Sequence, residues 1–307
     1  MKKSVINKLV LLGMAISLLL SGCSSDGSKA SASSNKDYTI GIVQLAEHPA
    51  LDDARRGFED GLKELGVDVE IVYQNAGGDI PTTVSISQKY VNDGVDLIYA
   101  IATNAAQSAK QVSHEIPVLF SAVTDPVEAE IVDAWDNVGG NVTGTSDMAP
   151  TAEQLKMFKE LDPSIETIGI LYNTSEPNSQ VQVEEVLKLA PGLGLEVKTV
   201  GVNNINDIAQ AIDSLLNKVD ALYGLSDNLI ASSVELVSTK LIENNMISIC
   251  AEESQVGGGL LITNGLSYYD LGKQTAGMAK EILVDKVAVS SIPVGLAEKT
   301  IVTVNEN

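Results

Sequence analysis

Short apolar runs alternate with longer segments of mixed polarity along the chain from Asp37 onward. The apolar runs predict strands and the segments between them predict helices, so the chain favours parallel sheets with helices on both faces. Thr151 and Gln154 predict a capping box at the start of one helix. The predicted strands are 38–43, 67–73, 96–101, 118–120, a short strand around 142, 167–172, 195–200, 221–225, 247–250, 260–263 and 299–304. The predicted helices are 51–65, 79–93, one from about 104, 151–161, 180–189, 205–217, 229–244 and 269–283.

One part of this pattern occurs twice. Residues 95–104 and 219–228 share Val, Asp, Tyr and Asn at the same spacing, at an offset of 124 (219 minus 95). Two further pairs of segments follow in the same order, at offsets of 128 (168 minus 40) and 131 (247 minus 116). Ordered self-similarity predicts two similar lobes. The alternative is that buried parallel strands simply resemble one another.

The first 22 residues have the features of a targeting segment. Three lysines precede an apolar run over 9–20 that is too short for a comfortable membrane span. The run ends in Leu20-Ser21-Gly22-Cys23, which resembles the lipobox of bacterial lipoproteins. Lipid on Cys23 would anchor the protein outside the cytoplasm without spanning the membrane, whereas an ordinary secretory signal would leave this cysteine incidental. Residues 23–36 are rich in Ser, Ala, Gly and Lys and predict a flexible tether.

Charge and cysteine content narrow the class of protein. The formal net charge is −21, and loss of residues 1–22 with their three lysines makes it −24. A nucleic-acid partner would need a basic face, which this composition does not provide; the acidity instead favours solubility. Apart from Cys23, Cys250 is the only cysteine. It lies in an apolar strand pattern, which predicts an inert core thiol and no disulfide.

Ligands of open parallel sheets bind beyond the carboxyl ends of the strands. The loops at those ends are polar, and several precede helices whose free N–H groups favour an anionic group. Glu47, Asp125, Glu176 and Asp227 could hold an ammonium group in the same cleft. This mixture suits an amino-acid-like ligand. The loops concerned are 44–50, 102–105, 121–126, 173–179, 226–228 and 252–255.

The two copies of the repeat place their polar ends on either side of this predicted cleft. We expect Asp227 to bind an ammonium group, while the Thr103 side offers hydroxyl and N–H donors. Asn104 and Asn228 fit ligand contacts and helix caps equally well. The complete set of predicted ligand-binding residues is Gln44, Glu47, Thr103, Asn104, Thr124, Asp125, Asn173, Ser175, Glu176, Ser179, Ser226, Asp227, Asn228 and Glu252.

Further motifs are spread in order over the mature chain. They are Ile-Gly-Ile at 40–42, Glu-His-Pro at 47–49, Leu-Asp at 51–52, Gly-Phe at 57–58, Ala-Val-Thr-Asp-Pro at 122–126, Tyr-Asn at 172–173, Glu-Pro-Asn-Ser at 176–179, Asp-Asn at 227–228 and Tyr-Tyr-Asp-Leu-Gly at 268–272. With the lipobox, they resemble the bacterial ABC-transporter substrate-binding lipoproteins, and within them the branch that binds the aromatic amino acids tryptophan and tyrosine.

The resemblance implies an α/β type I periplasmic-binding fold, with two doubly wound parallel-sheet lobes joined by a three-crossover hinge. Crossovers are expected near 145–150, 264–267 and 287–293. Lobe 1 would comprise 37–146 plus 267–289, and lobe 2 would comprise 147–266 plus 290–307. The last helix would then belong to lobe 1 and the last strand to lobe 2.

The resemblance also implies a function. A monomer would capture a small ligand, on this branch an aromatic amino acid, and deliver it to an ABC permease and its ATPase. Leu45, Ala105, Ala122 and Leu229 could form an apolar slot for a ring, with Tyr268 or Tyr269 at the hinge. The alternatives are a surface lipoprotein acting as adhesin or ligand-presenting sensor subunit, and a binder of a sugar or another small polar solute.

Enzymatic functions find little support in the sequence. Two histidines and one buried cysteine cannot build a His/Cys metal cluster, and no Gly-x-Ser-x-Gly motif occurs. The glycine fingerprint for a dinucleotide is absent after the strand that begins near Ile40. We therefore expect no catalytic residues, no metal and no cofactor.

Overall fold

A computed structural model of the protein describes residues 36–297 and 299–306. The predicted signal peptide, the predicted lipid site at Cys23 and the predicted tether up to residue 35 lie outside the described residues. Within the part that is described, no helix is both long and apolar enough to cross a membrane.

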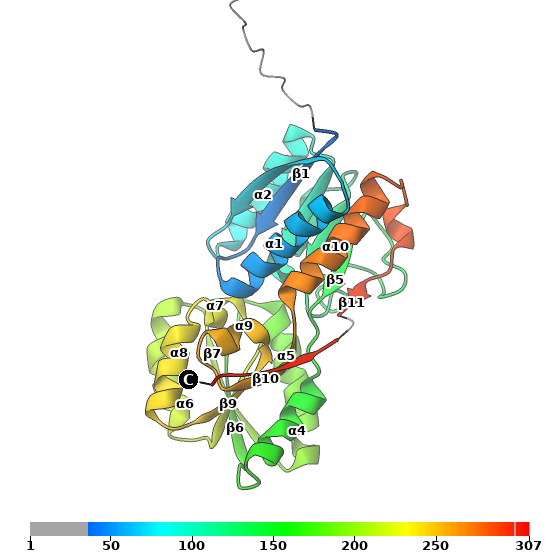
Figure 1. Cartoon of the computed structure of the whole chain (residues 1–307). Helices are drawn as coiled ribbons and strands as arrows, with labels where there is room; N and C mark the ends of the chain where they lie inside the picture. The colour runs from blue at the N-terminus through cyan, green and yellow to red at the C-terminus, as the bar shows by residue number, and fades with distance from the viewer. Residues whose placement is uncertain (1–35, 298, 307) are drawn as a thin grey trace, which may run out of the picture. The chain divides into compact units, whose positions relative to one another are not determined.

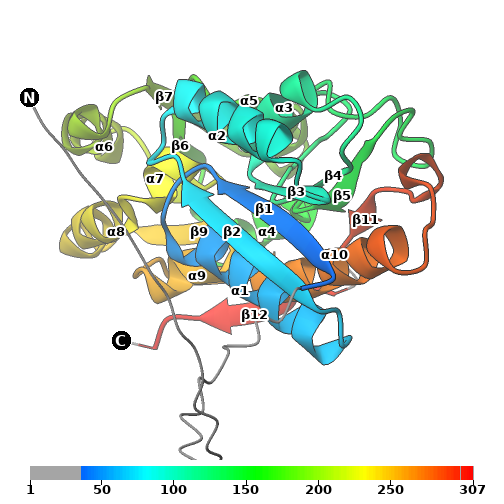
Figure 2. The ribbon, with the colours of Figure 1, turned by 90° about the horizontal axis from the view of Figure 1, so that it is seen from above.

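The first of two six-stranded sheets has the order β11-β5-β4-β3-β1-β2 and is parallel throughout. Helices α2 and α3 cover one face, and α1 and α10 run side by side over the other (Figures 1 and 2). The strands are β1 (Tyr38–Gln44), β2 (Val69–Asn75), β3 (Leu97–Ile101), β4 (Val118–Ser121), β5 (Val142–Ser146) and β11 (Gly295–Leu296). The helices are α1 (Pro49–Glu64), α2 (Ile80–Asp93), α3 (Thr103–Val112), α10 (Tyr268–Leu283) and the short 3-10 helix η3 (Val289–Ser291).

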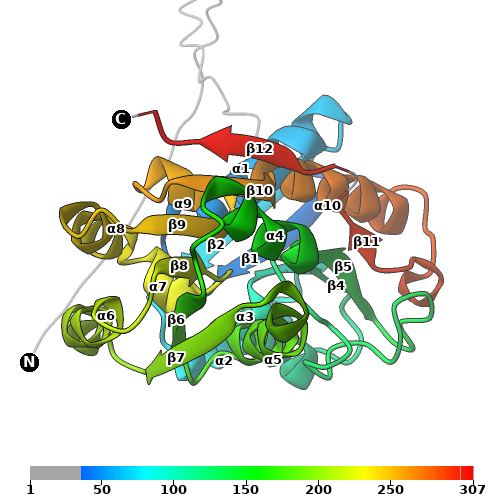
Figure 3. The same cartoon turned by 90° about the horizontal axis from the view of Figure 1, so that it is seen from below.

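The second sheet has the order β12-β10-β9-β8-β6-β7, and only the β10–β12 pair is antiparallel. Helices α4 and α5 pack on one face and α6 and α8 on the other (Figure 3). The strands are β6 (Thr167–Asn173), β7 (Glu196–Val202), β8 (Ala221–Gly224), β9 (Ile247–Glu252), β10 (Ile262–Leu266) and β12 (Ile301–Val304). The helices are α4 (Thr151–Leu161), α5 (Pro177–Leu189), η1 (Ala190–Leu193), η2 (Ile205–Asp207), α6 (Ile208–Leu216), α7 (Asn228–Ala231), α8 (Val234–Glu243) and α9 (Glu253–Gly257).

The two sheets have corresponding strand orders, and the sequence repeat marks equivalent strands, β3 and β8. The repeated aspartate has the same role in both copies. Asp96 accepts a hydrogen bond from the backbone N–H of Thr39 at the start of β1, and Asp220 accepts one from that of Thr167 at the start of β6. Each aspartate therefore ties its strand to a neighbouring strand.

The repeated tyrosine is a core residue in both copies, as predicted. Tyr99 is fully buried and stacks on Phe58 of α1 with ring centroids 4.0 Å apart. Tyr223 is equally buried and meets Phe158 of α4 edge to face, with centroids 6.3 Å apart. The predicted burial of Cys250 is also confirmed, in the core that β9 shares with α6 and α8.

The connections between the sheets differ from the expectation in one respect. The first two crossovers, between β5 and α4 and between β10 and α10, lie where they were predicted. The third was predicted at 287–293, but β11 pairs with β5 in the first sheet, so the chain crosses only after Leu296. The pairing places Gly295 and Leu296 in the first sheet, whereas the prediction assigned them to lobe 2; the division into lobes stays a proposal.

Every predicted strand and helix has a counterpart, but two local expectations failed. Thr151 forms no capping box, because its hydroxyl donates to Glu185 on α5 and Pro150 precedes the helix without a side-chain cap. The helix predicted over 229–244 is two helices, since Ser233 at their junction leaves the helical conformation. Helix α9 was not predicted, and the side chain of Glu252 caps it by accepting from the Ser254 N–H.

Candidate ligand-binding site

The loops at the carboxyl ends of the two sheets meet around two neighbouring cavities. One hydrogen bond joins the two sets of loops directly, between His48 Nε2 and Asn228 Oδ1 at 3.1 Å. The larger cavity has a volume of about 590 Å³ and the smaller about 10 Å³, and both are lined by residues from the two sets of loops. Because Asn228 lines both cavities, they adjoin at this residue.

The start of α3 offers unpaired hydrogen-bonding groups to this region. Ala102 precedes the helix with φ 85° and provides no side-chain cap. Among the described residues, no partner accepts from the backbone N–H groups of Thr103, Asn104 and Ala105, and Thr103 Oγ1 and Asn104 Oδ1 are likewise buried without partners. Asn104 lines the larger cavity. Free N–H groups at a helix start favour an anion, so this end of α3 suits a ligand carboxylate.

The equivalent start of α7 is closed by the protein itself. Glu176 accepts from the backbone N–H groups of Asn228 and Leu229 at 3.0 and 3.1 Å. Asp227 accepts from the N–H of Ile230 at 2.9 Å. These two carboxylates take the place that an anionic ligand would occupy at an open helix start.

Asp227 has further protein partners. Its second carboxylate oxygen accepts from the backbone N–H of Asn173 at 2.6 Å and from the Ser179 hydroxyl at 2.7 Å. Burial, and then the nearby charge of Glu176, raise the pKa of Asp227 above its usual range, while these donors act in the opposite direction. The carboxylate thus joins the loops after β6 and β8. Its predicted contact with an ammonium group remains a prediction that this hydrogen-bond pattern does not support.

The other predicted site residues fall into three groups. Those lining the larger cavity are Glu47, Asn104, Asn173, Ser175, Glu176 and Asn228. Those lining the smaller cavity are Ser226, Asp227, Asn228 and Glu252. Those lining neither are Gln44, Thr103, Thr124, Asp125 and Ser179.

Three members of the third group form hydrogen bonds that hold the loops in place. Asp125 accepts from the backbone N–H groups of Val127 and Glu128 and so closes a turn. Thr124 donates to Asp147 at 2.9 Å, and the Gln44 amide donates to the Ala46 carbonyl at 2.8 Å.

Asp147 and Tyr268 line the smaller cavity, and the sequence did not indicate the first of them. Asp147 follows β5 in the first crossover, and Tyr268 begins α10 after the second. The Tyr268 hydroxyl donates to Asp147 Oδ2 at 2.5 Å, so the bond joins two hinge segments. The sequence analysis had placed Tyr268 only at the hinge, beside a possible apolar slot for a ring. The sequence did contain one sign of Asp147, because it is an isolated acidic residue directly after the strand predicted around Val142.

Burial perturbs the acids of the smaller cavity. Asp147 and Glu252 are 4% and 1% exposed. Burial raises the pKa of Asp147, although Tyr268 and Thr124 donate hydrogen bonds to it. Burial likewise raises the pKa of Glu252 to about 7, against the opposing hydrogen bonds from Ser254. Desolvation of the charged form is therefore the dominant effect on both carboxyl groups.

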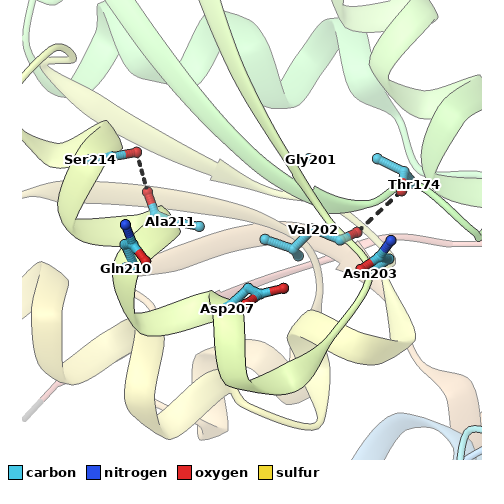
Figure 4. A pocket seen from close by; sticks show the side chains of 8 residues that line it. All are labelled: Thr174, Gly201, Val202, Asn203, Asp207, Gln210, Ala211 and Ser214. Carbon is cyan, nitrogen blue, oxygen red and sulfur yellow. Dashed lines mark hydrogen bonds between the residues drawn. The ribbon is translucent and has the colours of Figure 1, made fainter.

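A third hollow, of about 360 Å³, lies beside β7 and α6 in the second sheet (Figure 4). Thr174 and Ser214 on its wall donate to the backbone carbonyls of Val202 and Ala211. Its lining residues all lie between 174 and 214, so it takes nothing from the loops of the first sheet. It is therefore separate from the two cavities where the loops of both sheets meet.

Comparisons with known proteins agree with this architecture. Residues 39–307 match the model of a family described as ABC transporter substrate binding protein. The chain is 42% identical to a tyrosine-binding protein of Clostridioides difficile (strain R20291), over 100% of this chain and 91% of that protein.

Two solved structures are also similar. A domain from Streptococcus pneumonia in complex with L-Trp has a TM-score of 0.83 and 35% identity, covering 86% of this chain and 91% of that one. The ligand-free, open structure of a Clostridium difficile substrate-binding protein with adhesive properties has a TM-score of 0.68 and 42% identity, covering 88% of this chain and 92% of that one.

These matches confirm the type I periplasmic-binding fold predicted from the sequence. The chain belongs to the ABC transporter substrate-binding proteins, a family of extracytoplasmic, non-enzymatic proteins that bind small molecules.

Proposed function

We propose that the protein captures an aromatic amino acid between its two sets of loops and delivers it to an ABC permease. A monomer, held at the membrane by lipid on Cys23, would carry out this task. The observation that carries the proposal is the open start of α3, where the backbone N–H groups of Thr103, Asn104 and Ala105 have no acceptor among the described residues. A ligand carboxylate would accept from the free N–H groups there.

The walls of the larger cavity support an apolar side chain on the ligand. Leu45, Ile80, Pro81, Ile205 and Leu229 line it from both sets of loops. The described lining includes no aromatic ring on which a sugar could stack, so this composition favours an amino-acid side chain over a sugar. The tyrosine-binding relative and the L-Trp complex support an aromatic one.

Ligand capture would favour closure of the lobes. A ligand that contacts both sets of loops stabilises the arrangement that brings them together. The chain has a lower TM-score with the ligand-free, open structure (0.68) than with the L-Trp complex (0.83), despite higher identity to the former (42% against 35%). A hinge difference between similar lobes produces such a pattern.

A thermal-shift panel of the twenty amino acids, followed by calorimetry, tests the proposal. At a free concentration of 100 times Kd, a ligand stabilises the folded protein by about 2.7 kcal/mol, which gives a melting shift of several degrees. We expect L-tyrosine or L-tryptophan to give the largest shift. An Asn104→Ala variant should bind at least about tenfold more weakly, while Asn244→Ala on the far side of the second sheet should bind normally. The absence of a shift with any amino acid would refute the proposal.

A surface adhesin is a second candidate, because the similar C. difficile structure is described as having adhesive properties. Neighbouring genes for a permease and an ATPase would favour transport, and their absence would favour the adhesin. The lipid anchor has its own test: a Cys23→Ser variant should leave the membrane fraction and lose labelling by a palmitate analogue.

A further inference from the structure

We propose that the smaller cavity binds the ammonium group of the ligand through Asp147 and Glu252, with His48 and Asn178 as additional acceptors. The inference rests on the proposed capture of an amino acid and assigns its second charged group. It also moves the ammonium site away from Asp227, whose oxygens accept from three protein donors, one more than those of Asp147 or of Glu252.

The size of the cavity fits this group. Its volume of about 10 Å³ leaves room for roughly one water-sized group. An ammonium group has about that size, whereas a ring or a carboxylate would not fit. The cavity adjoins the larger one at Asn228, so the rest of an amino acid could extend from one into the other.

The tautomer of His48 follows from its partner. The Asn228 side-chain nitrogen donates to Glu176 at 2.6 Å, which leaves Asn228 Oδ1 as an acceptor facing His48 Nε2. His48 Nε2 therefore carries the hydrogen, and Nδ1 holds a lone pair. This Nδ1 atom is buried and has no partner in the described part of the chain. Burial lowers the pKa of His48, which agrees with a neutral ring.

Asn178 presents a second free acceptor. Its side-chain nitrogen donates to Glu176 Oε2 at 3.1 Å and to the Ser226 carbonyl at 2.8 Å. The amide oxygen, Oδ1, is then directed away from these partners and is buried without one of its own within the described residues. Asn178 is 5% exposed and His48 is 6% exposed.

The side chains that line the cavity thus offer several acceptors. Tyr268 lines it, but its hydroxyl hydrogen is already given to Asp147. Asp227 also lines it, occupied by its own donors. No lysine or arginine is among its lining residues in the described chain. A group with three N–H donors and a positive charge satisfies such a site, and buried carboxylates require this kind of compensation.

A metal ion is the other cation to consider. In residues 36–297 and 299–306, no group of three or more His, Cys, Asp or Glu side chains has a metal-binding arrangement. An organic cation is therefore the better match to these acceptors.

The test compares ligands that differ only in the amino group. Calorimetry would measure the affinity of the purified protein for L-tyrosine and L-tryptophan, and for their analogues 3-(4-hydroxyphenyl)propanoate and indole-3-propanoate. We expect Asp147→Asn to weaken binding of the amino acids by about 10- to 100-fold, the range for a lost charge-assisted hydrogen bond. The same substitution should change binding of the desamino analogues less than threefold, as should Asp93→Asn, an exposed control, for every ligand.

Equal losses for both classes of ligand, or no loss for either, would overturn the inference. If Asp147→Asn does not fold, as judged by circular dichroism, Glu252→Gln carries the same comparison. If the wild type binds none of the twenty amino acids, the proposed function fails and the subsite is tested with tyramine and tryptamine. Binding of an amine that depends on Asp147 would then support the subsite, and binding of neither amine would refute it.

Discussion

Glycines allow the backbones of α1 and α10 to approach closely, so a larger residue at this contact should destabilise the protein. A methyl group added at Gly272 of α10 would lie 2.1 Å from the carbonyl oxygen of Ala54 and 2.8 Å from the backbone nitrogen of Phe58. Both neighbours are backbone atoms of α1, which cannot rotate away as a side chain would. Gly272→Ala should therefore force the helices apart. Gly277 on the same helix has no neighbour within 4 Å and provides a matched control.

The expected magnitudes have opposite signs. Overpacking costs about 1–3 kcal/mol, and the upper end applies here because backbone must move. Replacing glycine by alanine within a helix stabilises the folded protein by at most about 1 kcal/mol, because alanine has the higher helix propensity. Gly272→Ala should therefore lower the free energy of unfolding by about 2 kcal/mol, whereas Gly277→Ala should raise it by up to about 1 kcal/mol.

Urea denaturation followed by tryptophan fluorescence can measure this difference. Trp135 is the only tryptophan and packs against the core of the first sheet, the core to which α10 contributes. Its emission therefore reports on the part of the molecule that the substitution disturbs. Equal stability of the two variants would refute the argument from backbone contact, and so would a Gly272→Ala protein as stable as the wild type.

Three further predictions concern strain, titration and reactivity. Ala102 has φ 85° and ψ 156°, a conformation that favours glycine, so Ala102→Gly should stabilise the protein by about 1 kcal/mol in urea denaturation. A pKa of Glu252 raised to about 7 from 4.5 means that the ligand-free protein loses stability as pH rises from about 4.5 to 7, by roughly 3 kcal/mol at most. The stability of Glu252→Gln relative to wild type should thus increase between pH 5 and pH 8, and a constant difference would contradict the pKa. In a Cys23→Ser background, Cys250 should react with a thiol reagent only on unfolding, because burial raises its pKa and excludes the reagent.

The architecture could be predicted from the sequence because each half repeats the same local pattern. The Asp and Tyr of the repeat recur for physical reasons that the structure identifies: each aspartate accepts from a neighbouring strand, and each tyrosine is a core residue that packs against a phenylalanine. The short strand β11 was missed because two residues carry no periodicity. The capping box failed because Thr151 found a tertiary partner in Glu185, which local spacing does not reveal.

The candidate site was harder to predict, because its chemistry depends on contacts between distant residues. The loops at the strand ends could be read from the strand pattern, but the hydrogen-bond partners within them could not. Asp147 and Tyr268 are 121 positions apart and meet only at the hinge. The glycines of the family motifs at 57–58 and 268–272 were visible in the sequence. The sequence did not show why glycine is needed there, which is the close contact of two helix backbones.

The difference between the two halves of the repeat determines in which direction an amino acid can lie in the site. Two equivalent open helix starts, at α3 and α7, would present two anion sites to one cleft, but an amino acid has a single carboxylate. Glu176 and Asp227 remove this ambiguity by occupying the N–H groups of α7, while those of α3 have no partner among the described residues. If the acceptors of the smaller cavity take the ammonium group, the ligand can bind in one orientation only. An Asp227→Asn substitution should therefore disturb the α7 cap and lower stability more than it changes the preference for amino acids over their desamino analogues. If Asp227→Asn instead reduced the preference for amino acids and left stability unchanged, Asp227 would be the residue that binds the ammonium group.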